Sequence, residues 1–155
     1  MRTRGLLAGA AVLALSGCAA AGAIANTQTI TLRDASGRTV GTALLTPATE
    51  GVQVVLSSSR LPAGVHGVHI HQTGLCDAPD FTTAGGHFNP TSRQHGTQNP
   101  AGPHAGDLPN LTVDANERGT LNGVAMGVTL EGSGANSLRK AGGTSLIVHA
   151  TADDY

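Results

Sequence analysis

From residue 28 onward the chain alternates short apolar and polar runs and shows no sustained helical period. Runs rich in Val, Ile, Leu and Thr are separated by Gly, Pro, Asn and Asp, which is typical of strands and turns. Because Asp-Ala-Ser-Gly at 34–37 is a turn sequence, the runs at 29–32 and 39–45 are predicted to form a β-hairpin. Further strands are predicted at 52–56, 65–71, 111–113, 119–125 and 145–149. The pattern predicts an all-β sandwich or barrel.

Two segments depart from this alternation. The segment Ser-Leu-Ile-Val-His at 145–149 contains a continuous apolar run, which favours a strand buried on both faces. Between residues 72 and 109 no convincing strand is found, and this interval holds three of the seven histidines. A loop of that length is normally functional or disordered, and its histidines favour function.

The N-terminus has the layout of a secretory signal. Arg2 and Arg4 precede an apolar run at 5–15, and small residues follow it. Leu-Ser-Gly-Cys at 15–18 resembles the bacterial lipobox, in which the cysteine is lipidated. Plain secretion is one alternative. An uncleaved anchor helix is the other, although this Ala- and Gly-rich stretch is weak for a membrane span.

We therefore expect a signal peptide at 1–17, a lipid on Cys18, a flexible tether at 18–28 and one domain at 29–155. This organisation places the domain in the cell envelope, either in the periplasm or on the outer cell surface, anchored to the membrane by lipid. A length of 155 residues suits a single core.

Composition narrows the class of function. The formal net charge is −1 and only 12% of residues are charged, which excludes the basic stripe of a nucleic-acid-binding protein. An apolar content of 39% at such low charge argues against disorder. We therefore expect a folded domain that does not bind nucleic acid.

The histidines indicate a metal centre. His69 and His71 end a predicted strand, and residues two apart on a strand point to the same face. Neutral imidazole is the commonest metal ligand and suits both zinc and copper. The remaining candidates are dispersed rather than contiguous: His87, His95, His104, Asp107 and His149. A zincin motif and the motifs of His-rich metallohydrolases and cupins are absent from the sequence.

Five segments together resemble the copper/zinc superoxide dismutases. They are Gly-Val-His-Ile-His-Gln at 67–72, Gly-Gly-His-Phe-Asn-Pro at 85–90, His-Gly at 95–96, His-Ala-Gly-Asp-Leu-Pro-Asn at 104–110 and Val-His-Ala at 148–150. The segment 85–90 and Cys-Asp-Ala-Pro-Asp-Phe at 76–81 resemble the exported bacterial branch. The resemblance spans 29–155 and implies a Greek-key β-sandwich or flattened barrel with a long metal-binding loop. It also implies disproportionation of superoxide to oxygen and hydrogen peroxide by a redox-cycling copper.

The resemblance also assigns roles to single residues. It implies copper ligands at His69, His71, His87 and His149, and zinc ligands at His87, His95, His104 and Asp107. In that assignment His87 bridges a catalytic copper and a structural zinc. Asp153 is expected to link a copper histidine to a zinc histidine, and His66 to be a buried, hydrogen-bonded framework residue.

The sequence departs from the family pattern after residues 153–154. The family pattern continues with an Arg beside copper, a second disulfide cysteine and a closing strand, and the sequence has none of these. Cys76 is therefore a disulfide candidate without a partner if Cys18 carries lipid. Either the sequence is part of a longer product, or it is a short variant for which we expect an open sheet edge and lower stability and activity.

These features of the sequence are compatible with three functions. The first is a superoxide dismutase with superoxide as substrate, a lipid-anchored membrane contact and a possible homodimer. The second is a dismutase-like lipoprotein that buffers or delivers copper and zinc without efficient turnover. The third is a structural exported β domain without stoichiometric metal.

Overall fold

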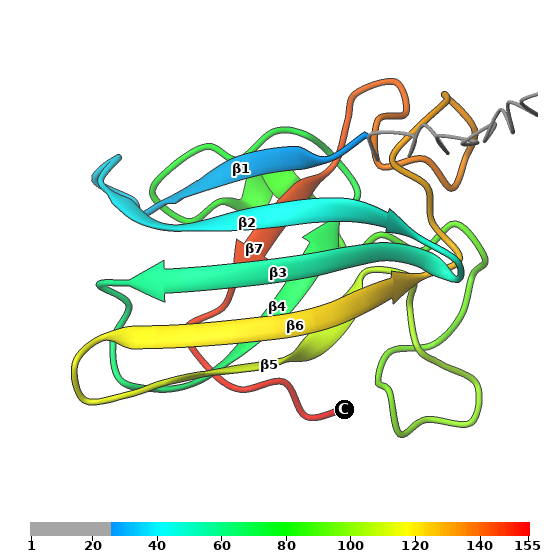
Figure 1. The fold of residues 1–155 in the computed structure, drawn as a ribbon. Helices are drawn as coiled ribbons and strands as arrows, with labels where there is room; N and C mark the ends of the chain where they lie inside the picture. The colour runs from blue at the N-terminus through cyan, green and yellow to red at the C-terminus, as the bar shows by residue number, and fades with distance from the viewer. Residues whose placement is uncertain (1–25) are drawn as a thin grey trace, which may run out of the picture.

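The computed structural model describes residues 26–155 and shows seven strands and one short 3-10 helix (Figure 1). The elements are β1 (Gln28–Arg33), β2 (Thr39–Ala48), β3 (Gly51–Ser59), β4 (Gly64–His71), η1 (Thr82–Ala84), β5 (Asp107–Val113), β6 (Arg118–Met126) and β7 (Ser145–Val148). The predicted signal peptide, Cys18 and most of the predicted tether lie outside the described residues. Gln28, the last residue of that tether, is the first residue of β1. Within residues 26–155 no helix reaches the length and apolarity needed to span a membrane.

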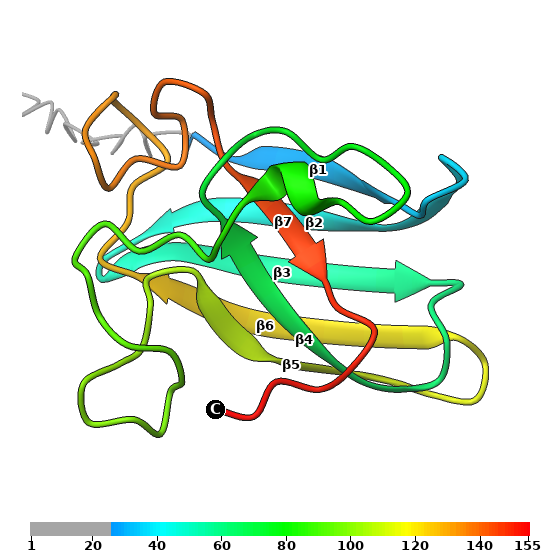
Figure 2. The same ribbon diagram turned by 180° about the vertical axis from the view of Figure 1, so that it is seen from behind.

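The strands form one antiparallel sheet that curls into a nearly closed barrel, as Figures 1 and 2 show from opposite sides. The order is β1-β2-β3-β6-β5-β4-β7, so the chain crosses over between β3 and β4 and returns between β6 and β7. The predicted hairpin of β1 and β2 is confirmed, with Thr31 opposite Thr42. This arrangement confirms the all-β Greek-key expectation. A groove of about 530 Å³ lies between the edge strands β1 and β7.

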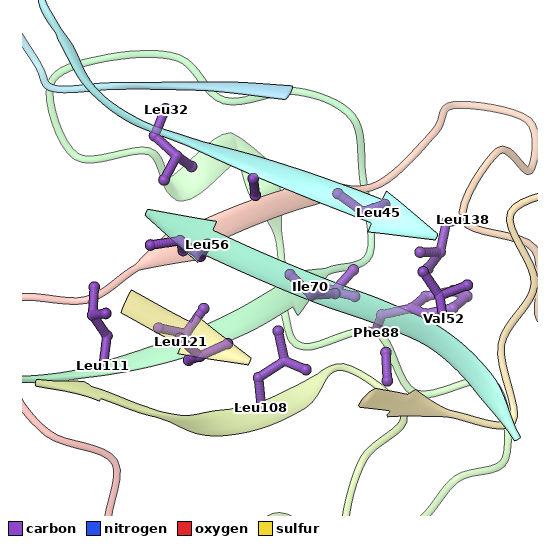
Figure 3. Close-up of a cluster of buried hydrophobic side chains, with 14 of the residues drawn as sticks. Leu32, Leu45, Val52, Leu56, Ile70, Phe88, Leu108, Leu111, Leu121 and Leu138 are labelled. Atoms are coloured by element: carbon purple, nitrogen blue, oxygen red, sulfur yellow. The ribbon is translucent and has the colours of Figure 1, made fainter. Parts of the chain in front are cut away.

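The core fills the inside of the barrel because alternate strand residues point inward. On β3, Val52, Val54 and Leu56 are fully buried, and the residues between them face outward. Leu108 and Leu111 of β5 meet them from the other side of the barrel (Figure 3). Phe88 extends the same cluster, which anchors the long loop directly beside His87. The core therefore fixes the backbone from which the candidate ligands project.

Two strand predictions need correction. The strand at 145–149 was expected to be buried on both faces, but β7 is an edge strand with four half-buried residues and ends at Val148. β5 begins at Asp107, inside the interval that was expected to lack a strand, and includes Pro109. Proline is tolerated there because the register of β4 and β5 shifts, which leaves Pro109 without a partner in β4.

Candidate metal centre

Strand β4 brings the first two candidate ligands together. His69 and His71 are both buried, and their ring centroids lie 6.4 Å apart. His149 follows β7 and lies beside β4 because its N–H donates a hydrogen bond of 2.8 Å to the carbonyl oxygen of Gly67. A β-bridge between His71 and His87 adds the fourth residue. Each of these four histidines offers a ring nitrogen within 4.8 Å of the others.

The hydrogen bonds of this group decide which ring nitrogens are free for a metal. His71 Nδ1 lies 2.7 Å from the carbonyl oxygen of Gly85, so Nδ1 carries the proton and Nε2 has the lone pair. That Nε2 lies 3.4 Å from His149 Nε2. His69 Nε2 lies 3.4 Å from an oxygen of Asp153, and His69 Nδ1 is buried without a hydrogen-bond partner.

A second group surrounds the carboxylate of Asp107. Its Oδ1 lies 2.9 Å from His87 Nδ1 and 3.3 Å from His104 Nδ1, and its Oδ2 lies 3.1 Å from His95 Nδ1. A ring nitrogen of His69 also lies within 4.8 Å of the possible ligand atoms of His87, His95 and Asp107. His104 is the better fourth donor, because its Nδ1 contacts both Asp107 and His87 Nδ1 while His69 Nε2 is directed at Asp153. His87 therefore lies in both groups.

Burial keeps His69, His71 and His149 of the first group uncharged. Burial, reinforced by an electrostatic effect of neighbouring His87, lowers the pKa of His69 to about 4. Burial also lowers the pKa of His71 and of His149. Neutral imidazoles at physiological pH are the form that binds a metal.

The carboxylates are held in their charged form. Burial alone would raise the pKa of Asp107, but hydrogen bonds from His87 and from the N–H groups of Gly96 and His104 bring it well below its ordinary value. Burial likewise opposes ionisation of Asp153, and hydrogen bonds from His95 and His69 lower its pKa. Burial would lower the pKa of His95, yet the Asp153 hydrogen bond and the charge of Asp107 raise it.

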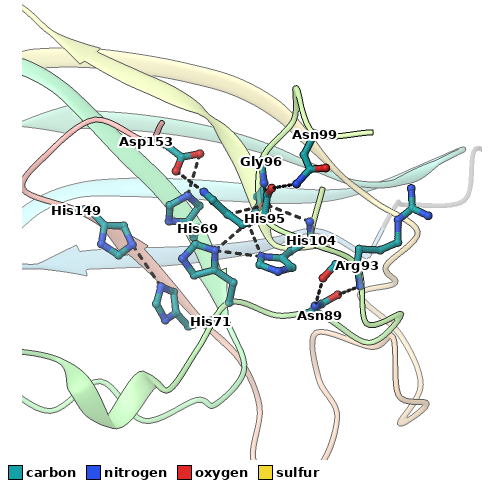
Figure 4. A network of polar contacts seen from close by, with 12 residues as sticks. His69, His71, Asn89, Arg93, His95, Gly96, Asn99, His104, His149 and Asp153 are labelled. Atoms are coloured by element: carbon teal, nitrogen blue, oxygen red, sulfur yellow. Dashed lines mark hydrogen bonds and ion pairs between the residues drawn. The ribbon is translucent and has the colours of Figure 1, made fainter. Parts of the chain in front are cut away.

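Asp153 links the two groups, as Figure 4 shows. His95 Nε2–H donates a hydrogen bond of 2.7 Å to Asp153 Oδ1, and Asp153 Oδ2 faces His69 Nε2 at 3.4 Å. The Asp153 side chain is only 5% exposed. His66 is also buried, with its ring nitrogens 2.8 Å from the carbonyl oxygens of Pro62 and His149. His66 is therefore a structural contact and not a member of either ligand group.

The unpaired atoms fit two cations. His69 Nδ1 and His95 Nδ1 are buried with no hydrogen-bond partner among residues 26–155, and such atoms are costly unless something binds them. Four imidazoles suit cupric copper, and three imidazoles with a carboxylate suit a closed zinc site. The donor set therefore fits copper in the first group and zinc in the second.

Some contributions to the site were not predicted from the sequence. The carbonyl oxygen of Gly85 fixes the tautomer of His71, and the N–H of Gly96 donates to Asp107. Both are backbone groups, which a residue pattern does not reveal. Cys76 is exposed and unpaired within the described part of the chain, so its disulfide stays a prediction.

Comparison with known proteins agrees with this geometry. Residues 39–155 match the family model of copper/zinc superoxide dismutase. Superoxide dismutase [Cu-Zn] 1 of Aquifex aeolicus is 44% identical over 77% of this chain and 71% of its own length. Superoxide dismutase [Cu-Zn] of Deinococcus radiodurans is 37% identical over 92% of this chain and 81% of its own length. The crystal structure of a SOD-like protein from Bacillus subtilis is 36% identical, covers 82% of this chain and 85% of that one, and superposes with a TM-score of 0.76.

The family match and these relatives agree with the barrel fold and with the two groups of candidate ligands that share His87. Copper and zinc are the metals that this family implies and that the donor set fits. The chain belongs to the copper/zinc superoxide dismutase family.

Proposed function

We propose that this chain converts two superoxide ions and two protons into oxygen and hydrogen peroxide. Copper would be held by His69, His71, His87 and His149, and zinc by His87, His95, His104 and Asp107. The observation that carries the proposal is the position of His87, whose ring lies in both ligand groups. A shared imidazole links the two sites directly.

The chain's residues prepare this site before any metal binds. The buried histidines are neutral and need lose no proton to bind copper. The Asp107 carboxylate is anionic and contacts three imidazoles, which suits a dication. When bound, copper supplies reversible one-electron exchange and zinc supplies a fixed positive charge beside His87.

His87 also has a role in proton transfer. Its Nδ1 is engaged on the Asp107 side at 2.9 Å, so Nε2 is the ring nitrogen left for the group of His69, His71 and His149. We assign to His87 Nε2 the proton that is delivered to the product peroxide. Asp153 supports the step by fixing the rings of His69 and His95, since carboxylates behind metal-bound histidines set their tautomer and orientation.

A superoxide-decay assay tests the proposal. Protein loaded with copper and zinc is mixed with superoxide in excess chelator, which suppresses catalysis by free copper. We expect rapid decay with the wild type and loss of that acceleration in His149→Ala. Asn122→Ala, an exposed β6 residue outside both ligand groups, is the matched control and keeps full activity. Stoichiometric metal binding with no acceleration would refute the dismutase and favour a protein that buffers or delivers metal.

We also propose that the protein acts in the cell envelope, attached to the membrane by a lipid on Cys18. The support is the Leu-Ser-Gly-Cys sequence at 15–18 behind a positively charged, apolar leader. Cells expressing the full chain and fed a labelled fatty acid should label the wild type and not Cys18→Ser. Labelling that persists in Cys18→Ser would show that the attachment site is wrong.

A further inference from the structure

We propose that Asn110 is a positioning residue of the metal centre, which holds the backbone of Asp153 and so sets how Asp153 ties His69 to His95. Asn110 lies on β5, three residues after Asp107, and the register shift leaves this residue without a partner in β4. Its backbone N–H is therefore free to bond to another segment. The inference rests on the proposed metal centre but not on turnover of superoxide.

The side-chain amide of Asn110 binds both backbone groups of one residue. Its Oδ1 accepts a hydrogen bond of 2.8 Å from the Asp153 N–H, and its Nδ2–H donates one of 3.2 Å to the Asp153 carbonyl oxygen. An amide that satisfies the donor and the acceptor of the same residue acts as a substitute for a neighbouring strand. This matters because residues 149–155 form no strand.

Contacts on either side of Asp153 also hold this segment of the chain in place. The N–H of Gly67 donates a hydrogen bond of 2.8 Å to the carbonyl oxygen of Thr151. A Cβ at Gly67 would lie only 3.2 Å from the Asp153 nitrogen, so the glycine lets this segment lie against β4. The N–H of Asn110 itself donates to the phenol oxygen of Tyr155 at 2.8 Å. Asn110 thus holds the segment at Asp153 and again at Tyr155.

With its backbone fixed, Asp153 has only its carboxylate left to contact other groups. That carboxylate is almost fully buried and reaches His95 at 2.7 Å and His69 at 3.4 Å. The opposite nitrogens of these two rings, both Nδ1, are buried without a hydrogen-bond partner. Movement of the Asp153 backbone would therefore turn a ligand of each proposed metal.

A double-mutant cycle on zinc affinity tests this role without measuring turnover. Zinc affinity is measured by chelator competition for the wild type, Asn110→Ala, Asp153→Ala and the double variant. Residues behind metal-bound histidines typically contribute about 10–100-fold in affinity, and we expect about tenfold weaker binding in Asn110→Ala. Because Asn110 acts through Asp153, the double variant should bind zinc no more weakly than Asp153→Ala alone. Asn122→Ala, the same change on β6, should leave zinc affinity unchanged.

A second variant covers the case in which Asn110→Ala does not fold. Asn110→Asp keeps the size and the acceptor for the Asp153 N–H but lacks the Nδ2 donor, and it takes the place of the alanine variant in the cycle. A spectroscopic readout accompanies both: the His95 Nε2–H proton signal of the metal-free protein should be sharp in the wild type and broadened by exchange in either variant.

Two results would overturn the proposal. One is unchanged zinc affinity in the Asn110 variants, and the other is an equal further loss when the Asn110 change is added to Asp153→Ala. Because the cycle needs no superoxide, a protein that passes it and fails the superoxide-decay assay would refute the dismutase function while leaving the role of Asn110 in place.

Discussion

At the scale of single residues, four of the seven candidate ligands are oriented by a group outside the proposed ligand set. Gly85 fixes His71, Asp153 fixes His69 and His95, and the N–H of Gly96 fixes Asp107. Such partners set which ring nitrogen is available. The chemistry of the site therefore depends on tautomers that the surrounding backbone selects.

The shared ring of His87 predicts communication between the two metals. Removing zinc from the copper- and zinc-loaded protein should change the electron paramagnetic resonance spectrum of copper, because a copper ligand loses its second partner. In His87→Gln, zinc removal should leave the copper spectrum unchanged. A wild-type spectrum that does not respond to zinc removal contradicts a shared imidazole.

The buried histidines predict how the stability of the metal-free protein depends on pH. The pKa of His69 falls from 6.5 to about 4 on folding, so between these values the unfolded chain binds a proton that the folded chain excludes. Stability is thus complete above pH 6.5 and is lost as the pH falls toward 4. The lowered pKa values of His71 and His149 act in the same direction, and the raised pKa of His95 opposes them.

Urea unfolding of the metal-free protein measures this effect. His69 alone contributes up to ~3 kcal/mol to the difference between neutral pH and pH 4. His69→Asn should show a shallower fall in stability than the wild type over the same range. Equal stability at pH 6.5 and pH 4.5 in the wild type would show that these rings are not buried neutral groups.

At the scale of elements, the barrel supplies half of the site and the long loop supplies the rest. Strand β4 presents His69 and His71, whereas His87, His95 and His104 come from residues 72–106. The loop is joined to the barrel by backbone hydrogen bonds. Ile70 and Gly106 are paired at 2.8 Å, and Phe88 bonds both of them, at 2.8 Å to Ile70 and 2.9 Å to Gly106. The loop is therefore held in place on both sides of its histidines.

The substitution Gly106→Ala tests this attachment. A Cβ at Gly106 would overlap the carbonyl oxygen of Ile70, so Gly106→Ala must push the loop away from β4. Overpacking of this kind typically costs about 1–3 kcal/mol. We expect that loss of unfolding free energy by chemical denaturation, together with weaker zinc binding.

Gly86→Ala is the matched control, since it lies in the same loop and a Cβ there meets no atom within 4 Å. It should fold with wild-type stability. If Gly106→Ala and Gly86→Ala behave alike, the attachment of the loop at Gly106 does not set the zinc site.

The strand predictions were right for strands with one buried face. They were wrong for a segment whose side chains are apolar but only half-buried. Alternation located β2, β3 and β6 because each has a core face and a solvent face. The apolar run at 145–149 predicts burial on both faces, yet β7 lies at the sheet edge. The spacing of His69 and His71 revealed their convergence, but no pattern could show that Asn110 would hold Asp153, a contact 43 residues apart.

At the scale of the whole molecule, one apolar core holds both halves of the metal centre. Leu108 is fully buried and follows Asp107 directly on β5, so a core residue and a proposed metal ligand are adjacent. Phe88 has the same relation to His87. A substitution that disrupts the packing of the core should therefore also displace the proposed metal ligands.

Leu108→Ala tests this coupling. Removing a fully buried leucine typically costs about 2–5 kcal/mol, and we expect that loss together with weaker zinc binding through a displaced Asp107. Leu75→Ala is the control because Leu75 is 59% exposed, and it should change neither property. Zinc affinity that is unchanged in folded Leu108→Ala would separate the core from the site.

The most direct measurement of the proposed function is the rate of superoxide decay as copper is added stepwise to the zinc-loaded protein, with excess chelator removing free copper. We predict that the rate rises in proportion to bound copper and reaches a plateau at one copper per chain. Tight binding of copper with no acceleration of superoxide decay at any loading would contradict the dismutase function.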